Sequence, residues 1–155
     1  GPSLHRSLLV ELTDRVRSLN MGLENRLQHA IGSLSGGQRQ ALTLLMATWR
    51  RPALLLLDEH TAALDPKSAD LVIQLTDALI RREGLTTLMV THAMPQAVHL
   101  GDRLVMMHRG RIVHDVSGAE KQRLRPGDLL DRFEDLRRQE LLDPSAAALL
   151  QAAYV

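Results

Sequence analysis

The chain has 155 residues, of which 45% are hydrophobic and 24% are charged, and this balance excludes a disordered or fibrous protein. A chain of this length buries enough surface for one domain with a sizeable core. Lys and Arg number 19 against 18 Asp and Glu, so no net charge draws the protein onto nucleic acid or anionic lipid. Cysteine is absent, which excludes disulfides and thiolate metal sites.

The longest apolar stretches, residues 41–47 and 53–57, are too short to cross a bilayer. A membrane-spanning helix needs ~20 apolar residues. Residues 1–3 lack the charged and apolar pattern of a signal peptide, and we interpret them as a remnant left by cleavage of a purification tag. The lack of cysteine fits a cytoplasmic protein.

The first predicted elements are two helices. One covers residues 8–19, because apolar residues recur there at helical spacing. They are Leu8, Leu9, Leu12, Val16 and Leu19. The other covers residues 36–51 and ends before Pro52. Its apolar stripe consists of Leu42, Leu45, Met46 and Trp49.

A short, continuously apolar run over residues 53–57 follows the second helix. Such a run is typical of a central parallel strand that is buried on both faces. It stops abruptly at Asp58 and Glu59, so these two acids should lie at the C-terminal tip of the strand.

Helices and strands alternate after this run. The predicted order is a helix over residues 66–83, a strand over 85–90, a helix over 95–100 and strands over 103–107 and 112–116. A tight turn joins the last two strands, so the sheet should gain an antiparallel edge there. Residues 126–139 and 144–153 are helical in pattern. The sequence thus predicts an α/β fold with a mostly parallel sheet flanked by helices.

The turn before the second helix has the composition of an anion site. Ser35, Gly36 and Gly37 stand directly before a helix, whose first N–H groups lack partners and carry partial positive charge. The glycines allow a close approach of the backbone to a phosphate, and the serine hydroxyl adds a donor. Taken alone, the same residues fit equally well an ordinary Ser N-cap followed by flexible glycines.

The acidic pair Asp58 and Glu59 lies where ligands bind in open α/β sheets, beyond the carboxyl end of a strand. Neighbouring strand residues point in opposite directions, so one carboxylate can reach Mg²⁺ while the other faces a water to be activated. Taken alone, an acidic pair after a strand is more often a solvated loop start.

His92 ends the next parallel strand, so we expect it beside the acidic pair. There an imidazole could contact a γ-phosphate or steady the attacking water. The other histidines have ordinary surface or core interpretations and do not form a zinc-binding pattern. They are His5, His29, His60, His99, His108 and His114.

Together these segments resemble the nucleotide-binding domain of the ABC ATPase superfamily, whose core is of the P-loop NTPase (RecA-like) class. In family order, residues 34–40 resemble the signature motif, 53–58 the Walker B strand, 63–65 the D-loop and 91–92 the switch histidine, with Glu59 as the catalytic glutamate. The resemblance runs from about residue 8 to about residue 116.

The resemblance implies that two such domains pair head to tail around ATP. The signature residues Ser35, Gly36, Gly37 and Gln38 would bind the γ-phosphate end of ATP held by the opposite subunit. Asp65, in the D-loop, would couple one ATP site to the other. In a transporter the further partners would be membrane-spanning subunits, with the ATPase at the cytoplasmic face of the cell membrane.

The resemblance also implies a role for each hydrolytic residue. Asp58 would bind Mg²⁺ through water, Glu59 would polarise the attacking water, and His92 would contact the γ-phosphate. His60 departs from the family pattern, in which proline commonly follows the glutamate, and it leaves this chemistry intact.

A larger departure is the lack of a phosphate-cradling G-x-x-x-x-G-K-[ST] loop: Lys67 follows Pro66, and Lys121 follows Glu120. We therefore expect the C-terminal part of an ABC ATPase domain that by itself neither binds nor hydrolyses ATP appreciably. Its expected divisions are residues 1–3, a helical subdomain portion over 4–51, the ATPase core over 52–117 and a helical extension over 118–155.

Two alternatives remain. ABC ATPases also drive DNA repair and translation factors, but a net charge near zero and 2% aromatic residues argue against a nucleic-acid partner. A non-catalytic dimerisation module would keep the fold and lend its signature turn to a partner. Glu59 and His92 disfavour that module, since a purely structural role has no need of them.

Overall fold

The computed structural model describes the backbone of residues 2–153 and the side chains of residues 6–141. It divides into two compact units, Gly1–Val90 and Thr91–Val155, which are described separately. None of the helices in the described part of the chain is long and apolar enough to span a membrane.

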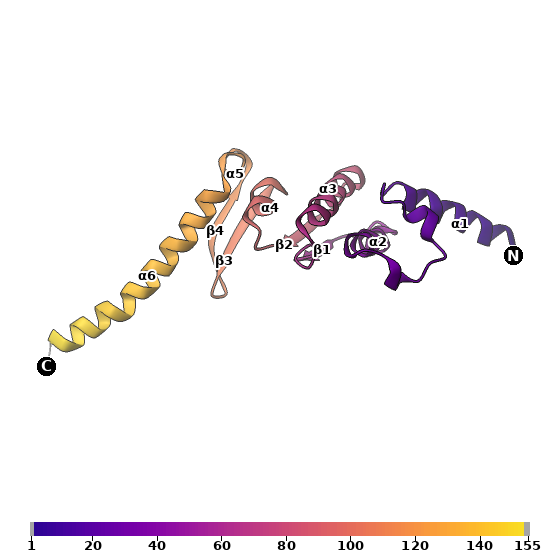
Figure 1. The fold of residues 1–155 in the computed structure, drawn as a ribbon. Coiled ribbons are helices and arrows are strands. Elements are labelled where there is room, and N and C mark those ends of the chain that lie inside the picture. The colour runs from indigo at the N-terminus through magenta and orange to yellow at the C-terminus, as the bar shows by residue number, and fades with distance from the viewer. Residues whose placement is uncertain (1, 154–155) are drawn as a thin grey trace. The chain divides into compact units, whose positions relative to one another are not determined.

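The first unit consists of helices and a small parallel sheet (Figure 1). Its elements are α1 (Pro2–Arg17), two short 3₁₀ helices (Leu23–Arg26 and Ile31–Ser33), α2 (Gly36–Thr48), β1 (Leu55–Asp58), α3 (Pro66–Glu83) and β2 (Thr87–Val90). The second unit contains α4 (Met94–His99), β3 (Arg103–His108), β4 (Arg111–Ser117), α5 (Gly118–Arg123) and α6 (Pro126–Ala153). The predicted α/β class is confirmed: a small parallel sheet is flanked by helices.

Strand β1 pairs with β2 in parallel, and α3 forms the crossover between them. One face of the sheet packs against α2 and α3 in a core made of Leu44, Leu55, Leu57, Leu79 and Leu85. On the other face, Leu56 is 64% exposed and Leu88 is 59% exposed. The prediction that this strand is buried on both faces is therefore wrong, because the described residues of this unit cover one face only.

The helices α1 and α2 close a second core around the loop that joins them. Its buried residues are Val16, Leu19, Leu23, Leu34, Ala41 and Leu45. Arg15 of α1 stacks on Trp49, with its guanidinium carbon 4.4 Å from the ring centre. The same guanidinium donates a 2.9 Å hydrogen bond to the Trp49 carbonyl at the C-terminus of α2, where a cation is favoured.

In the second unit β3 and β4 form an antiparallel hairpin. Arg109 and Gly110 make its two-residue turn, with φ of 48° and 74°. This left-handed pair matches the twist of hairpin strands. Helices α4 and α6 pack on one face of the hairpin through Val98, Leu104, Met106, Val116 and Leu129.

Two expectations about the second unit differ from the structure. β3 pairs with β4 and β1 with β2, so the described residues form two separate sheets rather than one. The hairpin has its own helical cover in α4 and α6, and its strands belong to the second compact unit. The two helices predicted over residues 126–139 and 144–153 form one helix, α6 (Pro126–Ala153), which continues through Pro144.

The predicted domain divisions remain predictions. Helix α1 begins at Pro2, while Gly1 lies outside the described residues, as do Tyr154 and Val155.

Candidate functional site

The anion-type turn predicted before α2 is a fully formed helix N-terminus. Ser35 is the N-cap: its hydroxyl accepts a 3.2 Å hydrogen bond from Gln38 N–H, and the Gln38 side chain accepts a 3.0 Å bond from Ser35 N–H. This reciprocal capping box fixes the turn. The N–H groups of Gly36 and Gly37, in the first helical turn, have no carbonyl partner within the helix and can face an anion.

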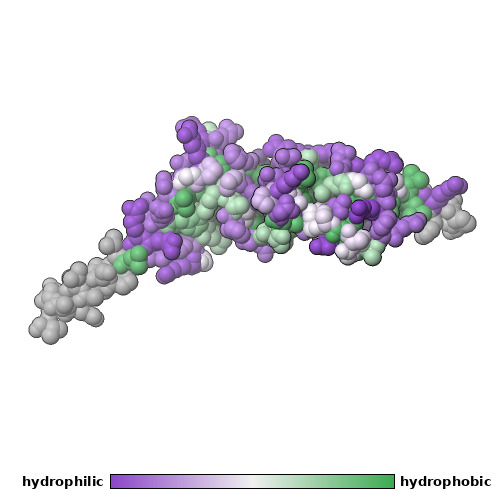
Figure 2. All heavy atoms as spheres, in the orientation of Figure 1, coloured by the Kyte–Doolittle hydropathy of each residue, from purple (hydrophilic) through white to green (hydrophobic). Residues whose placement is uncertain are grey.

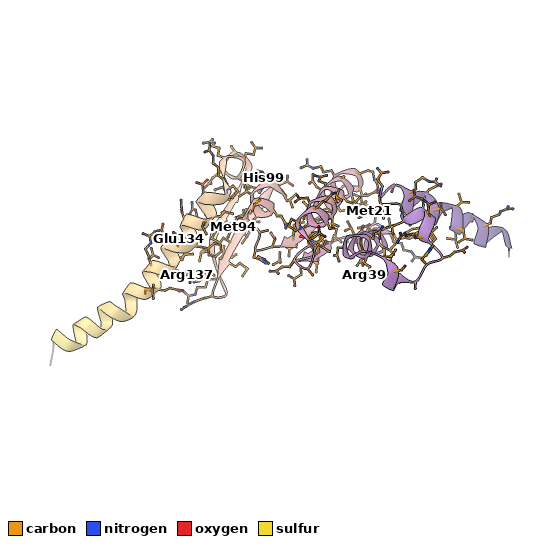
Figure 3. All side chains as sticks on the ribbon, viewed as in Figure 1. Met21, Arg39, Met94, His99, Glu134 and Arg137 are labelled. Atoms are coloured by element: carbon orange, nitrogen blue, oxygen red, sulfur yellow. The ribbon has the colours of Figure 1, made fainter. Side chains whose placement is uncertain are left out.

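Two further hydrogen bonds, which involve Met21 and Arg39 (labelled in Figure 3), hold the turn. The side-chain amide of Gln38 donates to the Met21 carbonyl at 3.1 Å. Arg39 reaches back and donates to the Leu34 carbonyl at 2.9 Å. The sequence does not predict either contact, because the sequence around a long polar side chain does not indicate which backbone carbonyl that side chain will bond.

The glycines let the N-terminus of α2 lie directly against that of α3. A Cβ added to Gly37 would be 3.2 Å from Ser68 Cβ, and one added to Gly36 would be 3.0 Å from a Leu64 methyl. The structure therefore brings the predicted signature turn and the predicted D-loop together. Two helix N-termini, each carrying partial positive charge, share this surface.

Asp65 is the N-cap of α3. Its carboxylate accepts a 3.0 Å hydrogen bond from Ser68 N–H, and Pro66 occupies the first helical position. The side-chain and backbone hydrogen bonds from Ser68 hold the pKa of the Asp65 carboxyl below its usual value. Asp65 is thus a carboxylate at a helix N-terminus, facing solvent.

The acidic pair lies at the tip of β1, as expected. Asp58 is the last residue of β1, lies opposite Val90 of β2, and is exposed. Glu59 follows with a φ of 43°, a left-handed conformation that is uncommon for residues other than glycine. Its N–H donates to the Val90 carbonyl at 2.9 Å and its carbonyl accepts from Ala62 N–H at 3.0 Å. The exposed carboxylate of Asp58 could reach a hydrated cation.

His60 is half-buried against α3, where its Nε2 lies 3.1 Å from the hydroxyl oxygen of Thr76. Burial lowers the pKa of His60. Sequence reasoning treated this residue as an ordinary histidine. The signal that could have found the contact is Thr76 itself, a polar residue on the buried line of α3 with Val72 and Leu79.

His92 lies in the segment between β2 and α4 and belongs to the second unit. Its neighbour Thr91 orders this segment: the hydroxyl donates to the Gln96 side chain at 2.9 Å and accepts from Ala93 N–H at 3.1 Å. The expected proximity of His92 to the acidic pair stays a prediction.

Within the described residues, no three His, Asp or Glu side chains are grouped so that they could hold a metal by themselves. A cation at Asp58 would need most of its ligands from water and from a bound phosphate. That is the usual way in which proteins hold Mg²⁺.

Comparison with known proteins gives a consistent result. A family model described as ABC transporter matches residues 10–62. A tyrosine transport ATP-binding protein of Clostridioides difficile is 47% identical over 119 residues, which are 77% of this chain and 47% of that protein. The lipoprotein-releasing system ATP-binding protein LolD 1 of Rhodospirillum rubrum is 43% identical over 93 residues, 60% of this chain and 41% of that protein. The methionine import ATP-binding protein MetN of Rhizobium etli is 41% identical over 95 residues, 61% of this chain and 26% of that protein.

The chain spans about half, or less, of the length of these curated relatives. The matched family model covers the turn before α2, β1 and the acidic pair that follows it. All three relatives carry the words ATP-binding protein in their names. The chain therefore belongs to the ABC transporter ATP-binding family, and it carries part of that family's ATP-binding domain.

Proposed function

We propose that this chain supplies the signature turn and the hydrolytic carboxylates of an ABC transporter ATPase that works as a head-to-tail dimer. The observation that supports this most is the contact between the N-termini of α2 and α3 at Gly37 and Ser68. It makes the signature turn and the D-loop one continuous surface. A surface of this kind can cap a polyphosphate held by a second subunit.

Each hydrolytic residue has a distinct role in the proposal. Glu59 orients and polarises the attacking water, and Asp58 holds Mg²⁺ through water. The cation neutralises the charge on the phosphates. His92 contacts the γ-phosphate, and Asp65 connects the two ATP sites. Hydrolysis of this kind depends mainly on positioning and charge stabilisation.

The proposal extends to partners and place. The relatives' names refer to tyrosine transport, lipoprotein release and methionine import. By analogy, membrane-spanning subunits would bind the complete ATPase at the cytoplasmic face of the cell membrane.

Since the chain carries no phosphate-cradling loop, we propose that it neither binds nor hydrolyses ATP appreciably alone. The test is calorimetric titration with Mg-ATP of this chain and of a chain extended by the preceding segment of a relative that supplies the loop. We expect no binding heat from the first and clear binding by the second. Magnesium-dependent turnover by the short chain, abolished by Glu59→Gln, would contradict this part of the proposal.

The catalytic assignment is tested in the extended chain. Glu59→Gln should leave ATP binding intact and lower turnover by about 100-fold or more. Glu134→Gln, the same change at an exposed position of α6 (Figure 3), is the matched control and should leave turnover unchanged. Equal turnover in both variants would remove Glu59 from its role.

A further inference from the structure

The contact between His60 and Thr76 allows the position of a proton to be assigned. Thr76 is 1% exposed, and its hydroxyl donates its single proton to the Val72 carbonyl at 2.7 Å. The Thr76 oxygen can therefore only accept from His60. His60 must donate, so the ring carries its proton on Nε2, which lies 3.1 Å from that oxygen.

This bond lies next to a residue in an unfavourable backbone conformation. Glu59 has a φ of 43°. Such a conformation persists only where the surroundings over-determine it. On one side the N–H of Glu59 is bonded to the Val90 carbonyl of β2 at 2.9 Å. On the other side the next side chain, His60, is bonded to the buried line of α3.

The turn is thus fixed at two points that belong to different elements. β2 holds the peptide that enters Glu59, and α3 holds the side chain that follows it. After these points the chain runs through Ala62 and Leu64, both in backbone hydrogen bonds, into the Asp65 cap. Loss of the His60 bond would remove this side-chain link between the turn and α3.

We propose that His60 is a positioning residue for Glu59, which it holds in the left-handed conformation by donating its Nε2 proton to Thr76. The inference rests on the proposed function only where it speaks of hydrolysis, because the tautomer and the backbone conformation can be measured in this chain itself. It assigns a task to a residue that departs from the family pattern. A histidine with a purely structural role would also have its tautomer fixed by a hydrogen bond, but its replacement would not alter kcat in a folded chain.

The first experiment is NMR of this chain with ¹⁵N-labelled histidine, at alkaline pH where the ring is neutral. We expect His60 to be the Nε2–H tautomer, and Glu59 to have the chemical shifts of a left-handed residue. In Thr76→Val, which keeps the buried volume, the preference for Nε2–H should be lost. An Nδ1–H tautomer in the unchanged chain would overturn the proposal without the need for any variant.

The second experiment compares two replacements of His60. His60→Gln keeps an N–H donor at similar reach, whereas His60→Leu removes the donor and keeps an apolar side chain. We expect the left-handed shifts of Glu59 to survive in the first variant and to be lost in the second. Left-handed shifts in a folded His60→Leu chain would overturn the proposal.

The functional arm uses the extended chain described above. His60→Leu should lower kcat by about 10- to 100-fold with KM unchanged, since a small misplacement of a catalytic group has an effect of that size. His60→Gln should restore most of the loss. If Glu59→Gln abolishes turnover and His60→Leu does not lower kcat, the positioning role is wrong. If Glu59→Gln leaves turnover intact, the proposed function fails. The NMR measurements would then still test whether His60 holds Glu59 in the left-handed conformation.

Discussion

The carboxylate of Asp65 caps α3, and that bond determines how the stability of the helix responds to acid. Its pKa lies below the usual 3.8 in the folded chain, mainly because of the hydrogen bonds from Ser68. A depressed folded pKa gives stabilisation that is present above the unfolded value and is lost as the pH falls through the folded one. The cap should therefore weaken only in strong acid.

We predict that Asp65→Asn, which keeps a good N-cap, removes this pH dependence. The difference in unfolding free energy between the natural chain and the variant should shrink as the pH falls below about 3.8. Urea unfolding at a series of pH values measures it. Asp70→Asn, at an exposed position further along α3, is the control and should show a smaller change. A pH-independent difference for Asp65→Asn would refute the prediction.

Among the described residues of the second unit, Lys121 is a buried cation that is only 5% exposed. Its ammonium donates a 2.7 Å hydrogen bond to the Val98 carbonyl near the end of α4, and burial lowers its pKa. The bond supplies a partner to a carbonyl at a helix C-terminus, where a cation is favoured.

Two substitutions separate the bond of Lys121 from the packing of its stem. Lys121→Met keeps the apolar stem and should lower the unfolding free energy by about 1–2 kcal/mol through loss of the bond. Lys121→Ala also loses buried methylenes and should cost about 1–3 kcal/mol more. Chemical denaturation followed by circular dichroism measures both. A Met variant as stable as the natural chain would mean that the bond contributes nothing net.

At the scale of elements, the approach of α2 to α3 depends on the absence of side chains at Gly36 and Gly37. The two glycines differ in what they face. Gly37 faces the Ser68 Cβ, which is fixed to the α3 backbone, whereas Gly36 faces the end of a Leu64 side chain, which can turn away.

We predict that Gly37→Ala is more destabilising than Gly36→Ala. An alanine in a helix normally gains about 0.5–1 kcal/mol over glycine, and at Gly37 the clash should outweigh that gain. Gly37→Ala combined with Ser68→Gly should recover part of the loss, because the clashing Cβ is removed. Thermal unfolding of the three variants is the measurement. Equal stability of the two single variants would show that the helices separate without cost.

The sequence predicts these elements well because their end signals are strong. Pro66 after Asp65 begins α3 as predicted, and Gly84, with a φ of 58°, ends it. The buried line of that helix is less predictable. The apolar spacing favours a stripe through Leu71, which is 50% exposed, whereas the structure buries Val72 and Thr76. The line of residues through Leu71 and the line through Val72 are shifted by one position along the helix. Which of them is buried depends on the elements that pack against α3.

In the candidate site, too, local features are predictable from the sequence and tertiary contacts are not. The caps at Ser35 and Asp65 and the acidic tip of β1 are local features, and each lies where the sequence places it. The contacts that join them depend on tertiary structure. The left-handed Glu59 has no local sequence signal. The bond between His60 and Thr76 is signalled only by a threonine on a helix line whose burial the sequence does not predict.

At the scale of the whole molecule, one face of the β1–β2 sheet exposes apolar side chains in the described part of the first unit. The exposed apolar residues there are Leu54, Leu56, Leu88 and Val90. Apolar surface also lies along α1, among charged residues (Figure 2). Parallel sheets are normally covered on both faces, so this surface should bind hydrophobic probes.

We predict that Leu56→Thr and Leu88→Thr together reduce the fluorescence of a bound hydrophobic dye. Threonine favours strands, and both positions are exposed, so each change should alter the unfolding free energy by less than about 0.5 kcal/mol. Leu57→Thr, on the buried face, is the matched control and should cost more than about 2 kcal/mol. Unchanged fluorescence in a folded double variant would mean that the dye binds at another surface and not at this face of the sheet.

The two-residue turn of Arg109 and Gly110 also suggests an order of events in time. Both residues take the left-handed geometry that a tight hairpin requires. Because only two residues separate β3 from β4, closing the loop between them costs little entropy and the strands can pair quickly. Hairpins of this kind form within about 1–10 μs. The pairing of β1 with β2 must wait until the whole of α3 has crossed between them, because parallel strands need a long connection. When the whole chain refolds from denaturant, it should thus acquire its hairpin early and the β1–β2 pair late. The late strands carry the exposed apolar side chains of Leu56 and Leu88, and surface of this kind makes an incompletely folded chain prone to aggregate.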